Sequence, residues 1–282
     1  MPMPDRQSLS VSTGNTLYIS DLDGTLLRSD QRTSAYTNET INRLVGEGMI
    51  FSYATARSFH TAQKATQGLK AKMPLIVYNG AFIIDNVTQE PLLANLFSAE
   101  EAAEILHVLL AAGVNPIVYC LDDRERFVYN STRINAETRA FVASRKGDSR
   151  DTPVEQDEAL FRRGTFYFTC IDAEAKLAPL HARYRDRFTC VFSRDIYTGA
   201  QWLELMPKTA TKAHAARQLA KLLGCSRIVA FGDAVNDLPL FEAADECYAV
   251  ANAADELKAR ATAVIAGNDE DGVAHWLTLN WK

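Results

Sequence analysis

Cysteine is scarce in this sequence, and no arrangement of cysteines suggests a disulfide framework or a thiolate metal centre. None forms a C-x-x-C pair, and their number is odd: Cys120, Cys170, Cys190, Cys225 and Cys247. This scatter is typical of unpaired thiols in a reducing compartment. We therefore expect a cytoplasmic protein.

Long apolar runs and blocks of basic charge are also absent. No stretch approaches membrane-spanning length. Residues 1–15 lack the apolar centre of a secretory signal, so we expect them to form a flexible tail. The net charge is -5, and no block of five or more basic residues occurs. These absences argue against nucleic acid and membranes as partners.

Short apolar runs alternate with helical segments at both ends of the chain, which is the pattern of an α/β protein with a parallel sheet. The middle of the chain has a different pattern, in which strand-like segments occur in pairs and alternate less often with helical segments. We therefore predict a parallel-sheet core built from residues 16–84 and 205–282, with residues 85–204 inserted as a separate α+β domain. Such insertions are tolerated where the two connections lie close together.

Three local patterns in this arrangement predict specific structures. Ser98 and Glu101 have the spacing of a capping box that opens a helix. Asn79-Gly80 favours a tight hairpin turn. The charged stretch Arg145–Glu158 is typical of a surface loop.

Two acidic motifs, far apart in sequence, each follow a strand-like run. The first is Asp21-Leu22-Asp23-Gly24-Thr25-Leu26, and the second is Gly232-Asp233-Ala234-Val235-Asn236-Asp237. Ligands of open parallel sheets bind outside the carboxyl ends of the strands. If the two strands are neighbours, up to four carboxylates crowd together, and such crowding is costly without a cation.

This donor set suits Mg²⁺, which prefers octahedral oxygen coordination with few carboxylates and several waters or phosphate oxygens. We expect Asp21, Asp233 and the carbonyl of Asp23 to be metal ligands. Asp237 and Asn236 would then hold waters or orient the ligands from behind.

The same residues suggest a phosphoryl-transfer reaction. Asp21, last on its strand, is the natural nucleophile for an aspartyl-phosphate intermediate. Asp23 would first protonate the leaving oxygen and then deprotonate the attacking water.

Further groups predict a cradle for the transferring phosphoryl group. Lys212 lies in the first turn of a helix, where a nearby anion offsets its unfavourable position. Thr55 can donate its hydroxyl to phosphoryl oxygens, and backbone N–H groups near Asp23 and Ala56 add to this cradle.

Simpler interpretations of these residues stay open. A D-x-D segment is commonly a solvated turn. Thr55 or Ser58 can serve as an ordinary helix N-cap. Lys208 competes with Lys212 for any catalytic assignment.

The order and spacing of the motifs resemble the haloacid dehalogenase superfamily, specifically its Cof-type phosphatases with a C2-type inserted cap. The resemblance covers residues 16–82 and 205–279. Its motifs are Asp21–Leu27, Ala54-Thr55-Ala56-Arg57, Tyr78-Asn79-Gly80-Ala81, Lys212, Gly232–Asp237, Asn252-Ala253 and Asp271-Gly272-Val273-Ala274. Ala56 departs from the pattern, because close relatives usually have glycine there.

The resemblance implies a Rossmann-like core with a cap, an essential Mg²⁺, Asp21 as nucleophile and Asp23 as acid/base. It also implies phosphate binding by Thr55 and Lys212, and Asp233 on the metal. We expect a phosphatase acting on small phosphorylated metabolites, sugar phosphates above all, as a monomer or small homo-oligomer. A phosphomutase or phosphotransferase, or a non-catalytic binding protein on the same fold, remains an alternative.

Overall fold

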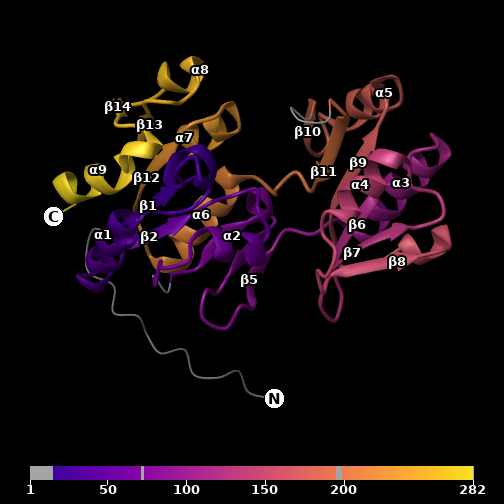
Figure 1. The fold of residues 1–282 in the computed structure, drawn as a ribbon, viewed down its shortest axis with the longest axis horizontal. Helices are drawn as coiled ribbons and strands as arrows, with labels where there is room; N and C mark the ends of the chain where they lie inside the picture. The colour runs from indigo at the N-terminus through magenta and orange to yellow at the C-terminus, as the bar shows by residue number, and fades with distance from the viewer. Residues whose placement is uncertain (1–14, 71–72, 195–198, 282) are drawn as a thin grey trace. The chain divides into compact units, whose positions relative to one another are not determined.

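The computed structural model describes residues 15–70, 73–194 and 199–281, and the chain divides into two compact units. The core unit contains the chain up to Leu93 and the chain from Lys212 onward, and the inserted unit is Ala94–Thr211 (Figure 1). All of the predicted tail except Asn15 lies outside the described residues. Within the described chain, no helix is both long and apolar enough to cross a bilayer.

The core unit is built on a five-stranded sheet in the order β14-β13-β12-β1-β2. Its strands all pair in parallel: β1 (Thr16–Ser20), β2 (Ile50–Tyr53), β12 (Arg227–Gly232), β13 (Glu246–Val250) and β14 (Ala263–Ile265). The neighbours β1 and β12 come from opposite ends of the chain, with Ser20 opposite Phe231. The predicted parallel core is confirmed, and the register brings the two acidic motifs together at the carboxyl ends of neighbouring strands.

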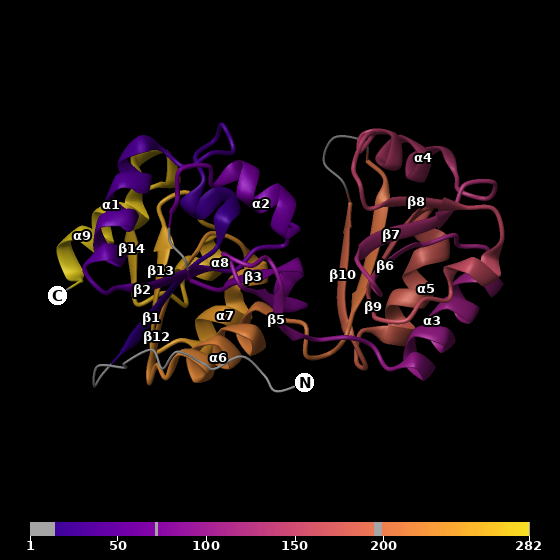
Figure 2. The ribbon, with the colours of Figure 1, turned by 90° about the horizontal axis from the view of Figure 1, so that it is seen from below.

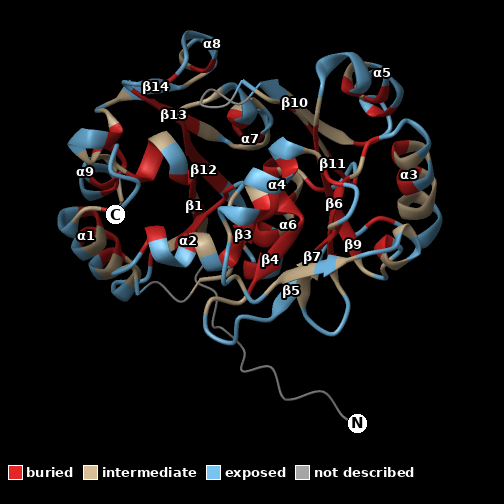
Figure 3. Ribbon diagram, turned by 45° about the vertical axis from the view of Figure 1, so that its right-hand side comes forward, coloured by how far each residue is buried: buried red, intermediate tan, exposed pale blue. Residues whose placement is uncertain are grey.

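Helices cover both faces of this sheet (Figure 2). On one side lie α1 (Ala35–Gly46) and α9 (Gly272–Asn280), and on the other lie α6 (Lys212–Leu223) and α7 (Leu238–Ala243). The central strands are therefore buried on both faces (Figure 3), as their apolar sequences predict. Two shorter helices, α2 (Phe59–Ala65) and α8 (Asp255–Lys258), follow β2 and β13.

A small second sheet extends the core unit, with strands β3 (Leu75–Val77), β4 (Phe82–Ile84) and β5 (Pro91–Ala94). The predicted turn at Asn79-Gly80 is confirmed, because β3 and β4 pair antiparallel around it. Asn79 has a left-handed φ of 54°, which asparagine tolerates better than most residues. β3 meets the five-stranded sheet at a single parallel bridge between Ala54 and Ile76.

The inserted unit is built on a six-stranded sheet in the order β10-β11-β9-β6-β7-β8. Its strands are β6 (Ile117–Leu121), β7 (Glu125–Asn130), β8 (Asp151–Val154), β9 (Thr165–Asp172), β10 (Thr189–Arg194) and β11 (Gln201–Met206). All of their pairings are antiparallel except that of β7 with β8. The prediction of a loop over Arg145–Glu158 is therefore wrong, because β8 lies within it. Arg150 forms ion pairs with Asp148 and Glu125, which reduces the net negative charge beside this edge strand.

One face of the inserted sheet carries the hydrophobic core of this unit. Helices α3 (Ala99–Ala111) and α5 (Glu174–Tyr184) supply Leu109 and Leu177, which pack in one cluster with Phe168 of β9. The predicted capping box of Ser98 and Glu101 opens α3. On the opposite face, Phe141 of α4 (Ala136–Ala143) meets the ring of Trp202 edge-on.

The compact units divide at other residues than the predicted 84/85 and 204/205. The second sheet of the core unit extends past residue 84 with β5, and β11 continues the inserted sheet to Met206. Secondary structure thus shifts both boundaries towards the C-terminus.

Two glycines of the inserted unit test how closely its backbones pack. Gly164 and Gly113 have similar left-handed φ angles of 67° and 70°. A Cβ on Gly164 would overlap the Leu121 carbonyl oxygen, whereas nothing lies within 4 Å of one on Gly113. Gly113→Ala should cost about 1–2 kcal/mol, and Gly164→Ala roughly 2–4 kcal/mol because the backbones must also separate. If denaturant unfolding showed equal losses of unfolding free energy for the two variants, the close approach of Gly164 to the Leu121 backbone would be contradicted.

Candidate active site

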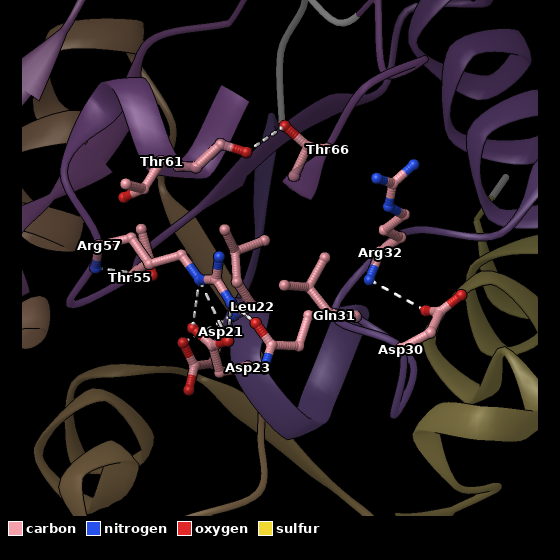
Figure 4. Close-up of polar contacts among 12 residues, drawn as sticks. Asp21, Leu22, Asp23, Asp30, Gln31, Arg32, Thr55, Arg57, Thr61 and Thr66 are labelled. Carbon is pink, nitrogen blue, oxygen red and sulfur yellow. Dashed lines mark hydrogen bonds and ion pairs between the residues drawn. The ribbon is translucent and has the colours of Figure 1, made fainter. Parts of the chain in front are cut away.

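Asp21 sits directly after β1 and is fixed from several directions. Its N–H donates to the Phe231 carbonyl at 2.9 Å, which ties it to β12. Its side-chain Oδ1 accepts from the Leu22 N–H at 2.6 Å, and the residue is only 5% exposed. Held by this backbone donor, the buried carboxylate keeps one orientation. Figure 4 shows Asp21 and its neighbours.

The turn that follows Asp21, Leu22–Leu26, packs directly against Asp233. The Thr25 hydroxyl donates to Asp233 Oδ1 at 2.8 Å. Gly24 has a φ of 74°, and a Cβ there would overlap Asp233 Oδ2. Only glycine combines this backbone conformation with so close an approach.

Lys212, the first residue of α6, lies between two carboxylates. Its Nζ is 2.8 Å from Asp21 Oδ1 and 2.7 Å from Asp237 Oδ1, and all three side chains are buried. Asp237 Oδ2 also accepts the N–H groups of Asp233 and Ala234 at 3.1 and 3.3 Å. Asp237 thereby links the lysine to the loop that carries Asp233.

The competing lysine, Lys208, has a different partner. Lys208 is exposed and belongs to the inserted unit, where its Nζ donates to the Asp186 carbonyl at 3.2 Å. The geometry thus favours Lys212 for any role beside Asp21.

The site carries more negative charge than its lysine neutralises. Oxygen atoms of Asp21, Asp233 and Asp237 lie within 4.8 Å of one another. With all three ionised, Lys212 leaves a net charge of -2, since three negative charges oppose one positive charge. Hard divalent cations take carboxylate oxygens of this kind. The residues therefore fit a metal ion such as Mg²⁺.

The pKa values reflect this crowding. Burial raises the pKa of Asp21 to about 7, with further increases from Asp237 and Asp233, although Lys212 opposes the shift. Burial also raises the pKa of Asp233. For Lys212, burial alone lowers the pKa, but Asp21 and Asp237 reverse this and raise it overall. The lysine therefore stays charged, and a cation would keep the carboxylates ionised.

The segment after β2 brings Thr55 to the same edge of the sheet. Thr55 is fully buried, its carbonyl accepts the Asn79 N–H at 2.9 Å, and its Oγ1 accepts the Arg57 N–H at 3.1 Å. The helix cap falls to Ser58 instead, whose side chain accepts from Thr61 at the start of α2. The N-cap interpretation is thus correct for Ser58 and not for Thr55.

Ala56, the departure from the family pattern, fits its position without strain. The residue is exposed, and its φ is not positive. An L side chain therefore pays no conformational cost where relatives usually have glycine.

Arg57 is a partner of Asp23 that sequence reasoning missed. Its Nε donates to Asp23 Oδ2 at 2.9 Å and its Nη2 lies 2.5 Å from Asp23 Oδ1, so the guanidinium holds the half-exposed carboxylate with two nitrogens (Figure 4). This hydrogen bonding raises the pKa of Arg57 still further. The only signal in the sequence was a basic residue two positions after Thr55.

The structure gathers some of the predicted site residues more closely than others. Asp21, Asp233 and Lys212 meet, and Asp237 joins them as a buried member of the carboxylate group. The Asp23 carboxylate lies outside that group and forms an ion pair with Arg57. Asn236 is exposed in the short turn Val235–Asp237.

Comparison with known proteins identifies the family. The family of haloacid dehalogenase-like hydrolases matches residues 18–277. The chain belongs to this family. The expected superfamily and the expected hydrolase class are both confirmed.

Similar haloacid dehalogenase-like proteins span almost the whole chain. Two curated phosphatases of Bacillus subtilis are named for 5-amino-6-(5-phospho-D-ribitylamino)uracil: YwtE is 28% identical, with 91% of this chain and 95% of the relative covered. YitU is 27% identical, with 91% and 94% covered. The crystal structure of TM0651 from Thermotoga maritima superposes with a TM-score of 0.78 at 24% identity, covering 95% of this chain and 98% of that one. The last comparison supports the fold alone.

Replacing Asp233 with asparagine tests the charge imbalance. Because burial raises the pKa of Asp233, its ionised form is disfavoured in the folded protein at neutral pH. Without metal, Asp233→Asn should therefore unfold at higher denaturant concentration than wild type at pH 8. This difference should shrink as the pH falls and the wild-type carboxyl takes up a proton.

With Mg²⁺ bound, the wild-type protein should instead unfold at a higher denaturant concentration than Asp233→Asn. At a hundred times its dissociation constant, Mg²⁺ should stabilise the wild-type protein by about 2.7 kcal/mol, and Asp233→Asn should lose this gain. Asp30→Asn, which changes an exposed acid whose carboxylate accepts from Arg32, is the control and should keep it. Equal Mg²⁺ stabilisation of all three proteins would contradict a metal site at Asp233.

Proposed function

We propose that the chain is a Mg²⁺-dependent phosphatase that hydrolyses small phosphorylated metabolites, sugar phosphates foremost, through an aspartyl-phosphate intermediate. The observation that carries this proposal is the Asp21 carboxylate, held by Lys212 within an acidic group at the edge of the parallel sheet.

Asp21 is proposed as the nucleophile because its contacts distinguish its two oxygens. The Leu22 N–H and the Lys212 ammonium both bind Oδ1. This orients Oδ2 as the oxygen that attacks phosphorus. The Lys212 charge also favours the ionised, nucleophilic form of Asp21.

Asp21, Asp233 and the carbonyl of Asp23 would hold the Mg²⁺, and Asp237 would orient Asp233 through the loop backbone. When bound, the ion offsets the charge of the carboxylates and of the phosphoryl group.

Asp23 is proposed as the acid/base residue. In the first step, Asp21 Oδ2 bonds to phosphorus, the ester P–O bond breaks, and Asp23 gives its proton to the leaving oxygen. In the second step, a water bonds to phosphorus, Asp23 takes its proton, and the bond to Asp21 breaks to release inorganic phosphate. Arg57 fixes the Asp23 carboxylate in place between these steps.

Binding of the phosphoryl group is proposed for residues that surround Asp21. Lys212 supplies positive charge, and the Thr55 hydroxyl supplies a donor once its hydrogen turns towards the ligand. The backbone N–H of Ala56 and the exposed side chain of Asn236 would complete the cradle.

The substrate class draws support from the names of two relatives. YwtE and YitU are named for a phosphate ester on a ribityl chain, which is a small polyhydroxylated compound. A sugar or polyol phosphate is the corresponding expectation here. We further propose a cytoplasmic enzyme that works as a monomer or small homo-oligomer.

Asp21→Asn tests the nucleophile. The variant keeps the shape of the side chain, and Lys212 keeps Asp237 as a partner, so folding should persist. Phosphate release should fall by on the order of a thousandfold or more, as expected when the nucleophile of a covalent mechanism is lost. The exposed change Asp30→Asn should leave the rate unaltered. Turnover of Asp21→Asn at the wild-type rate would refute the nucleophile assignment.

A product analysis separates hydrolysis from transfer. With Mg²⁺ and a panel of sugar and polyol phosphates, we expect release of inorganic phosphate that EDTA abolishes. An isomerised sugar phosphate without phosphate release would identify a phosphomutase instead. No change in any ester would favour a binding protein.

A further inference from the structure

The turn that carries Asp23 is held by two asparagines from the C-terminal third of the chain. Asn252 Nδ2 donates to the Gly24 carbonyl at 2.7 Å, and its Oδ1 accepts the Asn268 N–H at 3.0 Å. Asn268 Nδ2 in turn donates to the Leu27 carbonyl at 2.9 Å. These three hydrogen bonds form a chain, called the relay below, that holds the turn at Gly24 and at Leu27.

The relay is anchored beside the other acidic motif. Asn252 follows β13, and Asn268 follows β14, the next strand of the sheet. Two residues after Asn252, the Ala254 N–H donates to the Asp233 carbonyl at 2.8 Å. The short segment 252–254 therefore contacts both acidic loops and fixes their separation.

The turn needs such a restraint because Gly24 does not select its conformation. Asp23 (φ -71°, ψ 122°) and Gly24 (φ 74°, ψ -4°) form a type II turn. Glycine populates positive and negative φ about equally, so rotation about the Gly24 backbone bonds costs little locally. That rotation would move Asp23 relative to the Gly24 carbonyl, which Asn252 holds.

A side-chain amide suits this position. The Gly24 carbonyl needs a donor and the Asn268 N–H needs an acceptor, which also fixes the orientation of the Asn252 amide. Aspartate offers no donor when ionised, and alanine offers neither group.

We propose that Asn252 is a positioning residue for catalysis, which holds the Gly24 peptide so that Asp23 keeps its place, with Asn268 as its support. The inference rests on the proposed function and deepens it. Asn252 itself does not touch the reacting atoms.

Asn42 provides a matched control in the same unit. Its Nδ2 donates to the Gly68 carbonyl at 2.8 Å and its Oδ1 accepts the Lys70 N–H at 2.6 Å. Asn42→Ala therefore removes one donor bond and one acceptor bond, as Asn252→Ala does, but between α1 and the loop after α2.

The first measurement is hydrogen exchange of the protein alone, read on peptides that cover residues 22–27. Exchange there should rise about tenfold or more in Asn252→Ala and stay at the wild-type rate in Asn42→Ala. The second measurement is steady-state phosphate release. Asn252→Ala should lose roughly ten- to a hundredfold in kcat, with KM changed less than about threefold, whereas Asn42→Ala should keep both.

Two further readouts separate positioning from general weakening of the fold. An alkyl phosphate needs the proton of Asp23 more than p-nitrophenyl phosphate does, so Asn252→Ala should lose more activity on the alkyl ester. The double variant Asn252→Ala/Asn268→Ala should lose less than the product of the two single losses, because both residues belong to one relay.

The outcomes are distinguishable. Unchanged exchange at residues 22–27 in Asn252→Ala, or an equal kcat loss in Asn42→Ala, would overturn the positioning role. Absence of turnover in the wild-type enzyme would contradict the proposed phosphatase instead, and the exchange rates would still decide whether Asn252 holds the turn.

Discussion

The buried ammonium of Lys212 between Asp21 and Asp237 is the interaction on which the rest of the site depends. Removing a charge from water is expensive, and a buried ion pair repays this only with close geometry and further hydrogen bonds. Here both carboxylates also accept backbone N–H groups. One lysine thereby ties the end of β1 to the loop after β12, and a third carboxylate, Asp233, is left for a cation.

Pairing of β1 with β12 makes this arrangement possible. The strands come from opposite ends of the chain, and their parallel register sets Asp21 beside the start of the second acidic motif. Gly24 then lets the first turn approach Asp233 more closely than any side chain would permit. The family relationship agrees with this geometry.

Strand-end residues were the most predictable part of the site. Asp21, Thr55 and Asp233 follow apolar strands, and parallel topology brings the ends of such strands together. The ion pair between Arg57 and Asp23 was not predictable, because it joins two loops whose paths depend on tertiary packing. β8 was not predicted for a related reason, since the acids beside it, Asp148 and Glu125, pair with Arg150, and no pattern within the strand reveals this. Asn252 was visible as part of a motif, but only coordinates reveal that it reaches Gly24.

The central claim is that one divalent ion binds between Asp21 and Asp233. Diffraction from crystals grown with Mn²⁺, recorded near its absorption edge, tests this most directly. We expect an anomalous peak with carboxylate oxygens of both residues as ligands. A fully occupied manganese ion elsewhere in the core unit, with Asp21 and Asp233 both uncoordinated, would contradict it.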